Sequence, residues 1–317
     1  MFFDCVIVGG GPAGLSAALM LGRCLRRVLL CDAGEPRNVR SRAIHGYLTR
    51  DGTSPAGFLR AARAELARYE TVELRAATVT DARPSSRGFR VELEGGAAVE
   101  GRKLLLATGV VDELPPVPGL SDLYGTSVHH CPYCDAWEWR GHPLAVLGKA
   151  DTGTGLALAL TRWSPDVVLC TDGPSPIEPD ELHRLGGAGV RVCDEPLLRL
   201  EGRDGLLARI VFAGGHTLER SALFLACSQR QRSPLAERLG CTFTSRGAVD
   251  TGFCESTNVP GVYVAGDASK EAQFVVVAAA EGAEAGMAIN KALAAEDLRS
   301  AGEPRHPSPS SPDAYSV

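Results

Sequence analysis

Two cysteines separated by two residues offer the clearest chemistry in this chain of 317 residues. They are Cys131 and Cys134, in the run HHCPYCD. Cysteines at this spacing at a helix start can close a small disulfide, and the helix end and its neighbours can lower the pKa of one thiol so that a thiolate exists near neutral pH. One thiolate can then attack a disulfide while the other resolves the mixed species. The sequence therefore predicts a redox-active dithiol/disulfide pair.

The same two cysteines could instead be half of a zinc site. A structural zinc site needs four ligands, usually from two such pairs, and the sequence has no second C-x-x-C and no H-x-x-x-H. We therefore predict no metal site. His129 and His130 precede the pair, and a histidine titrates at about pH 6.5, so either could act as a base. His130 is the stronger candidate because it is adjacent to Cys131.

A glycine-rich turn near the N-terminus predicts a dinucleotide site. Residues 9–14 (GGGPAG) fit G-x-G-x-x-G, after a predicted strand over residues 5–8 and before an Ala/Leu-rich helix to about Arg23. Such glycines allow a tight turn, approach of the backbone to a pyrophosphate and close packing of helix on strand. Asp32 ends the next predicted strand, at about the 20-residue spacing of a carboxylate that binds the ribose. The turn residues predicted to contact the dinucleotide are Gly9, Gly11, Pro12, Ala13 and Gly14.

The same order of elements begins again in the middle of the chain. An apolar strand is predicted over residues 144–147, followed by glycines over 148–155, a helix to about Trp163 and a strand over 167–170. The chain therefore contains two similar nucleotide-binding units. The predicted fold class is α/β, with two Rossmann-like, doubly wound nucleotide-binding domains, of which the first is discontinuous in sequence.

The domain boundaries follow from the connecting segments. Residues 114–119 (LPPVPG) suit a crossover, because their prolines rule out a regular helix. We expect the return near residues 245–247, since residues 261–290 read as a strand, a Gly-Asp turn and a small-residue helix. The predicted division is residues 1–113 and 245–297 for the first domain, 114–244 for the central domain that carries the cysteine pair, and 298–317 for a disordered tail rich in Pro and Ser.

Composition excludes several classes of function. Hydrophobic residues make up 44% and charged residues 22%, the balance of a globular protein that buries a substantial core. A formal net charge of -5 and the lack of a Lys/Arg cluster argue against nucleic acid as a partner. No apolar run reaches the roughly 20 residues of a membrane span, and the N-terminus lacks the basic region of a signal peptide. We therefore expect a cytoplasmic protein that is not bound to a membrane.

In the reducing cytosol most of the ten cysteines are expected to be free thiols. Eight of them are scattered, mostly within apolar stretches. We interpret these eight as buried small hydrophobic residues, because free cysteine is among the most buried residue types. They are Cys5, Cys24, Cys31, Cys170, Cys193, Cys227, Cys241 and Cys254.

The order of these motifs resembles the low-molecular-weight thioredoxin reductase family, across nearly the whole chain to about Ala295. The matching features are the first glycine turn, the ATG at Thr108 and Gly109, C-x-x-C-D ahead of a second nucleotide fold, and Gly266-Asp267. The resemblance implies FAD in the first domain, a homodimer, and an Asp135 that gives and takes protons at the thiols. It also implies that Cys134 lies nearer the flavin and that Cys131 meets the substrate.

Further FAD contacts are implied by the same resemblance. The Gly-Asp turn would place Asp267 on the ribityl chain, and the helix that begins near Gln273 would point its positive N-terminal end at the flavin ring. The implied FAD contacts outside the first glycine turn and Asp32 are Asn38, His45, Thr108, Gly109, Gly266, Asp267, Gln273 and Phe274.

The chain departs from a reductase where NADPH would bind. The second glycine turn, GKADTG, is a loose match, and the arginines that hold the 2'-phosphate are missing; Asp172 stands near their place. This leaves NAD(P)H a doubtful cofactor. The family's Arg-Gln pair at the flavin helix is also Ala272-Gln273 here, which weakens transfer of the reductase mechanism.

A branch of the family shares this departure, namely the dithiol oxidases that close disulfides in metabolites such as gliotoxin, holomycin and romidepsin. DAGEPRN, HGYLTRDG and CPYC resemble that branch. It implies that electrons pass from a small-molecule dithiol to the cysteine pair, to FAD and to O2, with hydrogen peroxide as the by-product. Two alternatives stay open: an NAD(P)H-dependent reductase of thioredoxin or a related protein, and a flavin-dependent redox sensor that switches a protein partner.

Overall fold

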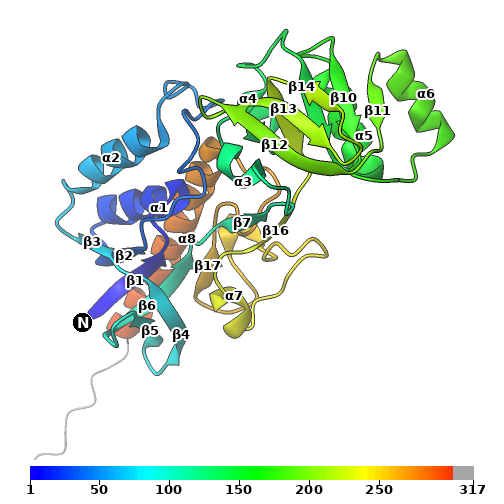
Figure 1. Cartoon of the computed structure of the whole chain (residues 1–317). Coiled ribbons are helices and arrows are strands. Elements are labelled where there is room, and N and C mark those ends of the chain that lie inside the picture. Colours follow the sequence, from blue (N-terminus) through cyan, green and yellow to red (C-terminus); the bar gives the residue numbers. More distant parts are fainter. Residues whose placement is uncertain (303–317) are drawn as a thin grey trace, which may run out of the picture.

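The computed structural model describes residues 1–302, which form two lobes joined by two extended connections (Figure 1). Each lobe has a sheet with parallel strands and helices against it. This confirms the predicted α/β class with two Rossmann-like units. Residues 298–302 belong to the last helix, although the tail was expected to begin at residue 298. The rest of that tail, residues 303–317, lies outside the described residues.

The first lobe is built on a seven-stranded sheet with the order β3-β2-β1-β6-β5-β4, and β17 also pairs with β6. Its strands are β1 (Phe2–Val8), β2 (Val28–Asp32), β3 (Val72–Ala76), β4 (Val79–Ser85), β5 (Gly88–Leu93), β6 (Ala98–Leu106) and β17 (Val262–Val264). Strands β1, β2, β3, β6 and β17 are parallel, whereas β4 and β5 form an antiparallel extension. Because β17 comes from the far end of the chain, the first unit is discontinuous in sequence, as predicted.

Small residues bring two helices of the first lobe into close contact. Helix α8 packs along α1, and a Cβ atom at Gly282 would lie only 2.0 Å from the carbonyl oxygen of Ala13. The small-residue composition that predicted this C-terminal helix is therefore a packing requirement. The helices of this lobe are α1 (Pro12–Arg23), α2 (Pro55–Leu66), α7 (Leu235–Arg238), the 3-10 turn η1 (Phe253–Glu255) and α8 (Val275–Gly302).

The second lobe contains a five-stranded parallel sheet with the order β11-β10-β9-β15-β8. Its strands are β8 (Val128–His129), β9 (Leu144–Leu147), β10 (Val167–Cys170), β11 (Arg191–Cys193) and β15 (Ala222–Leu225). The strands predicted over 144–147 and 167–170 are confirmed. A three-stranded antiparallel sheet, not predicted from the sequence, consists of β12 (Leu197–Arg203), β13 (Leu206–Phe212) and β14 (Thr217–Glu219). The helices are α3 (Leu120–Leu123), α4 (Pro132–Asp135), α5 (Ala150–Leu160) and α6 (Pro179–Gly187).

Two antiparallel strands, β7 (Val110–Glu113) and β16 (Ser228–Gln231), carry the chain between the lobes. The chain thus returns earlier than the expected position near residues 245–247. The residues after β16 already pack on the first lobe, where Leu235 and Val249 join its core. The sequence of β16, SQRQ, is polar, so it carries no hydrophobic pattern that would reveal a strand.

Burial of the eight scattered cysteines follows the prediction for most of them. Five are buried, and Cys193 and Cys227 are partly buried, but Cys24 at the end of α1 is exposed. Burial raises the pKa of the Cys31 thiol to about 11, which keeps it protonated and unreactive.

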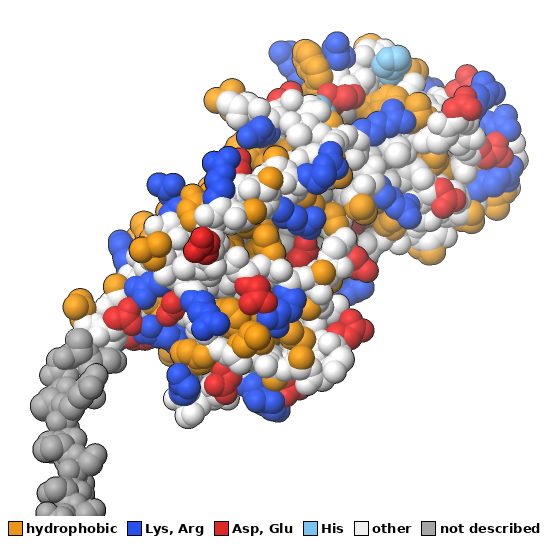
Figure 2. All heavy atoms as spheres, turned by 90° about the vertical axis from the view of Figure 1, so that its left-hand side faces the viewer, with side chains coloured by type: hydrophobic (Ala, Val, Ile, Leu, Met, Phe, Trp, Pro, Cys, Tyr) orange, Lys and Arg blue, Asp and Glu red, His pale blue; other side chains and the backbone are white. Residues whose placement is uncertain are grey.

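On the face shown in Figure 2, Lys and Arg side chains are interspersed with Asp and Glu. Within residues 1–302, no helix is both long and apolar enough to cross a membrane.

Candidate active site

A cavity of about 1040 Å³ connects the first glycine turn with the cysteine pair. This volume is in the range of ligand and cofactor sites. Nearly all the residues predicted to act in binding or catalysis line it, with the exceptions of Gly14 and Cys131. The predicted residues that line it are Gly9, Gly11, Pro12, Ala13, Asp32, Asn38, His45, Thr108, Gly109, His130, Cys134, Asp135, Gly266, Asp267, Gln273 and Phe274.

The glycines of the first turn fall into two groups. Gly9 has a φ of +113°, and a Cβ there would lie 2.2 Å from the carbonyl oxygen of Ala107; a Cβ at Gly14 would lie 1.9 Å from the carbonyl oxygen of Gly9. These two glycines are needed for packing. A Cβ at Gly11 would meet no described atom within 4 Å, because this residue faces the cavity. Gly11 therefore leaves room for a ligand at the N-terminus of α1.

Two carboxylates frame the cavity. Asp32 at the end of β2 accepts hydrogen bonds from the backbone N–H of Gly34 at 3.0 Å and from Arg63 at 2.6 Å. Asp267 follows β17 and accepts one from Arg37 at 2.8 Å. Both oxygens of Asp32 and one oxygen of Asp267 accept these bonds, and each carboxylate retains acceptor capacity for hydroxyl groups. This arrangement fits the ribose and the ribityl chain of a flavin dinucleotide.

Cys131 and Cys134 form a disulfide, with their Cα atoms 5.3 Å apart. The short helix α4 begins directly after Cys131, whose Sγ accepts a hydrogen bond from the backbone N–H of Cys134 at 3.1 Å. Cys134 lines the cavity and Cys131 does not. The two sulfurs are thus presented to different surroundings, Cys134 towards the dinucleotide site.

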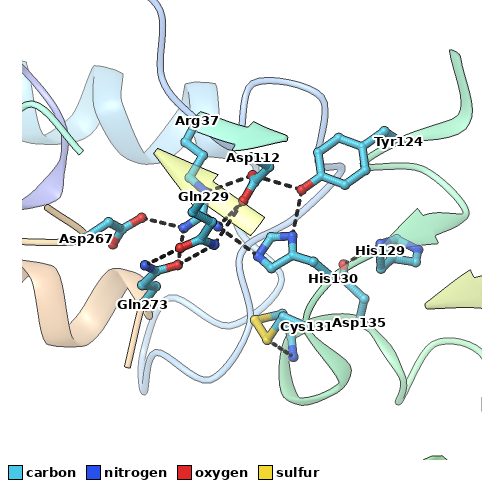
Figure 3. Close-up of a disulfide and its surroundings, with 11 residues drawn as sticks. Arg37, Asp112, Tyr124, His129, His130, Cys131, Asp135, Gln229, Asp267 and Gln273 are labelled. Carbon is cyan, nitrogen blue, oxygen red and sulfur yellow. Dashed lines mark hydrogen bonds and ion pairs between the residues drawn. A yellow bond between two sulfur atoms is a disulfide. The ribbon is translucent and has the colours of Figure 1, made fainter. Parts of the chain in front are cut away.

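His130 lies between the disulfide and a polar network that spans both lobes (Figure 3). Arg37 donates to Asp112 at 2.9 Å and contacts Nε2 of His130 at 3.2 Å. Because a guanidinium only donates, Nε2 is the acceptor and Nδ1 carries the proton. Nδ1 lies 2.7 Å from the hydroxyl of Tyr124, which itself donates to Asp112 at 2.9 Å. Both ring nitrogens of His130 are therefore engaged.

Burial and the nearby Arg37 hold the pKa of His130 below its usual range, so the imidazole is neutral at neutral pH. Burial alone would raise the pKa of Asp112, but the hydrogen bonds and charge of Arg37 outweigh it and hold that pKa below its usual range. The charges of Arg37 and Asp112 thus balance each other, and the neutral His130 is hydrogen-bonded to Arg37. For His130 to take a proton on Nε2, Arg37 would first have to move away.

The network continues to the start of α8. Gln273 accepts from Arg37 at 2.7 Å and exchanges two hydrogen bonds with Gln229 on β16, at 2.8 and 2.9 Å. Four members of this network were not predicted from the sequence, namely Arg37, Asp112, Tyr124 and Gln229. Arg37 lies in the DAGEPRN run that carried the resemblance, but Asp112 and Gln229 meet only because β7 and β16 pair. That pairing leaves no local signal in the sequence.

His45 lines the cavity and lies close to two carboxylates. Its Nδ1 lies 3.4 Å from Asp51 and its Nε2 lies 3.6 Å from Glu138, which follows the cysteine pair in the chain. His45 therefore joins the first lobe to the segment that carries the redox pair. Among the residues that the structure describes, no group of three or more His, Cys, Asp or Glu side chains is arranged to hold a metal ion.

The second glycine turn keeps the outer glycines of the motif but not the middle one. A Cβ at Gly148 would lie 2.8 Å from the Cα of Gly153, so these two glycines are packed as in the first turn. The position of the middle glycine is taken by Ala150, with a φ of +45°. Its backbone N–H donates to the hydroxyl of Ser175 at 3.1 Å. Asp172, after β10, accepts from the backbone N–H of Leu197 at 2.8 Å.

A disulfide beside a cavity that two nucleotide-binding folds line is typical of a disulfide oxidoreductase. The chain belongs to the pyridine nucleotide-disulphide oxidoreductase family, whose sequence model matches residues 3–282. It is 32% identical to thioredoxin reductase tcpT of Claviceps purpurea, over 92% of this chain and 95% of that protein. The structure of HlmI is similar with a TM-score of 0.90 and 36% identity, covering 94% of this chain and 95% of that one.

A thioredoxin reductase, TrxB from Bacillus anthracis, has a TM-score of 0.89 and 30% identity, covering 93% of this chain and 99% of that one. Together these similarities confirm the predicted place of the chain among thioredoxin reductase-like proteins, in the branch that its motifs resemble. The protein is thus a thioredoxin reductase-like disulfide oxidoreductase of a family whose members use FAD. The open space at Gly11 and the two framing carboxylates fit that cofactor.

Proposed function

We propose that this protein oxidises a small-molecule dithiol to a disulfide, with FAD as the first electron acceptor and O2 as the last. The observation that carries this proposal is the contrast between the two glycine turns. The first opens into a cavity that reaches Cys134, whereas the second has its helix N-terminus bonded to Ser175.

The details of the second turn argue against a nicotinamide dinucleotide. The middle glycine of the motif lets the backbone approach a pyrophosphate, and here that position carries the methyl group of Ala150. The N–H that would bind a phosphate is already used by Ser175. Asp172, after β10, is negatively charged and would repel a 2'-phosphate. NAD(P)H is therefore a poor electron donor for this protein.

The cysteine pair can perform the exchange without another cofactor. A substrate thiolate attacks the sulfur of Cys131, and the Cys131–Cys134 bond breaks with its electron pair on Cys134. The second substrate thiol attacks the mixed disulfide, an S–S bond closes in the substrate, and Cys131 is released. The substrate loses two electrons and two protons, and the pair gains them. FAD would supply the acceptor for these two electrons and their route to O2, which becomes hydrogen peroxide.

Asp135 is the group best placed to move the protons. It directly follows Cys134, lines the cavity and is about a quarter exposed, and its Oδ1 lies 3.3 Å from Nδ1 of His129. Its other oxygen has no hydrogen bond or ion pair among the described residues. That oxygen can take a proton from an incoming thiol and return it to a cysteine. His130, in contrast, has both ring nitrogens engaged.

The test is rapid anaerobic mixing of the flavin-loaded protein with dithiothreitol, NADPH or NADH. We expect the dithiol to bleach the flavin absorbance and both nicotinamides to leave it unchanged within the turnover time. Admission of air should restore the absorbance and produce one hydrogen peroxide per dithiol oxidised. The Cys134→Ser variant should lose the bleaching by dithiol. Bleaching by NADPH or NADH at the rate of turnover would overturn the proposal.

The second candidate is an NAD(P)H-dependent reductase of thioredoxin or a related protein. The names of the relatives favour it, since both tcpT and TrxB are called thioredoxin reductases. The second lobe also keeps the parallel strand order of a nucleotide-binding fold. The same mixing experiment separates the two candidates, because the reductase requires fast reduction by a nicotinamide.

A further inference from the structure

The two histidines before the cysteine pair face different parts of the molecule (Figure 3). His130 belongs to the network around Arg37. His129 is 5% exposed and lies on β8, where it is paired in register with Phe224 of β15. Its ring packs against Phe224 and Trp139, at centroid distances of 5.5 and 6.3 Å. The sheet and two aromatic rings thus fix His129 in place.

The proton on His129 can be located from its partners. The indole N–H of Trp139 lies 3.1 Å from Nε2 of His129, and an indole can only donate. Nε2 is therefore the acceptor, and the proton of the neutral ring is on Nδ1. That nitrogen lies 3.3 Å from Oδ1 of Asp135. Trp139 in this way holds His129 in the tautomer that presents an N–H to the carboxylate.

A histidine in this position cannot act as the base. Its only lone pair in the ring plane accepts from the indole N–H of Trp139, and its side chain is almost fully buried. Its Nδ1–H faces Oδ1 of Asp135, however, and this polar contact favours one orientation of the carboxylate. Oδ2 is then the oxygen left for proton exchange with the thiols.

We infer that His129, locked in one tautomer by Trp139, is a positioning residue that orients Asp135 for proton transfer at the Cys131–Cys134 pair. This inference rests on the proposed function, in which the reduced pair receives two protons with its two electrons. The proton path is from the substrate thiol to Asp135 Oδ2 and from there to a cysteine thiolate. His129 and Trp139 neither gain nor lose a proton in this path.

The first test observes the tautomer directly. In long-range ¹H–¹⁵N spectra of protein labelled with ¹⁵N-histidine, assigned with a His129→Gln variant, we expect His129 to show the pattern of an Nδ1-protonated neutral ring. Trp139→Phe keeps a ring at this position and removes the N–H donor, so the pattern should shift towards the Nε2-protonated form. The matched control is Trp137→Phe, which alters an exposed tryptophan of the same turn. An Nε2-protonated ring in the unmodified protein would overturn the inference.

The second test asks whether Trp139 acts through Asp135. The rate at which dithiothreitol reduces the disulfide is followed by alkylation of the cysteines, which requires no flavin turnover. We expect Asp135→Asn to slow this step by about 100-fold and Trp139→Phe by about 10-fold. The double variant should be no slower than Asp135→Asn alone, because neighbours that act through one group are not additive. A purely structural role of Trp139 would give a different result, because the loss of an independent contact would add to the effect of Asp135→Asn.

The outcomes also separate this inference from the proposed function. Additive losses in the double variant would show that Trp139 acts independently of Asp135 and would refute the positioning role. An Asp135→Asn variant that reacts at the normal rate would refute it as well, whereas dithiol oxidation by the cysteine pair would still stand. Failure of the dithiol to bleach the flavin would refute the proposed function, and the tautomer of His129 would be unaffected.

Discussion

The two glycine turns of this molecule show which parts of a nucleotide-binding motif serve packing and which serve the ligand. Both turns keep the outer glycines, because a Cβ at Gly14 or at Gly153 would be 1.9 or 2.6 Å from backbone of the same turn. They differ at the middle position, where the first has Gly11 and the second has Ala150. The fold thus survives the loss of the glycine that admits a ligand, provided that the packing glycines remain.

The largest effect is expected from a side chain at a packing glycine. Gly14→Ala places a Cβ 1.9 Å from the carbonyl oxygen of Gly9, so α1 must move away from β1. Overpacking of this kind costs about 1–3 kcal/mol or more, and we expect loss of bound flavin as well. Urea denaturation and the flavin absorbance measure both. The control is Gly155→Ala on the exposed side of α5, where no described atom lies within 4 Å; it should stabilise by about 0.5–1 kcal/mol, because alanine is the better helix former.

A smaller and more selective effect is expected at Gly11. An alanine there fits the folded chain, since φ is -78° and no atom of residues 1–302 would lie within 4 Å of the Cβ. The methyl group instead occupies the space in which a pyrophosphate would approach. We expect Gly11→Ala to weaken FAD binding by about 10-fold or more, which corresponds to about 1.4 kcal/mol, with the unfolding free energy of the flavin-free protein unchanged. An unchanged FAD affinity would contradict the assignment of this turn to the cofactor.

Local patterns in the sequence predicted the parts of the site that consist of contiguous residues. The glycine turn with its flanking strand and helix, the C-x-x-C pair, and the Gly-Asp turn before a small-residue helix are all found in the described chain. The network of Arg37, Asp112 and Gln229 was not predicted, because it depends on strands β7 and β16 meeting across a sequence separation of more than 100 residues. The position of the return was missed for the same reason.

At the second glycine turn we expect a substitution at the middle position to stabilise the fold. Ala150 adopts a φ of +45°, a left-handed conformation that disfavours residues with a side chain. Ala150→Gly relieves this strain, and after allowance for the greater freedom of glycine in the unfolded chain we expect a gain in stability of about 0.5 kcal/mol. The variant should still not be reduced by NADH, because Ser175 continues to bond the N–H of residue 150. Reduction by NADH in this single variant would show that Ala150 alone excludes the nicotinamide.

The last effect depends on pH and concerns the buried carboxyl group behind the Gly-Asp turn of the first lobe. Glu281 on α8 accepts a hydrogen bond from the backbone N–H of Gly266 at 2.7 Å. Burial raises the pKa of Glu281 to about 7, and nearby Glu255 adds to the shift. Between its usual range and about pH 7 the folded state therefore holds a proton that the unfolded state has lost, so the free energy of unfolding falls as the pH rises through this window.

Glu281→Gln keeps an acceptor for Gly266 and removes the titration. Compared with the unmodified protein, the variant should lose less stability between pH 5 and pH 7.5, the difference being at most about 1.4 kcal/mol per pH unit. Urea denaturation at the two pH values measures this difference. The control is Glu284→Gln on the same helix, because the side chain of Glu284 makes no hydrogen bond or ion pair among the described residues. Parallel stability curves for the unmodified and Glu281→Gln proteins would show that this carboxyl group is already ionised at pH 5. In that case the backbone N–H of Gly266 would donate to a carboxylate, so that a buried negative charge would stabilise the Gly-Asp turn.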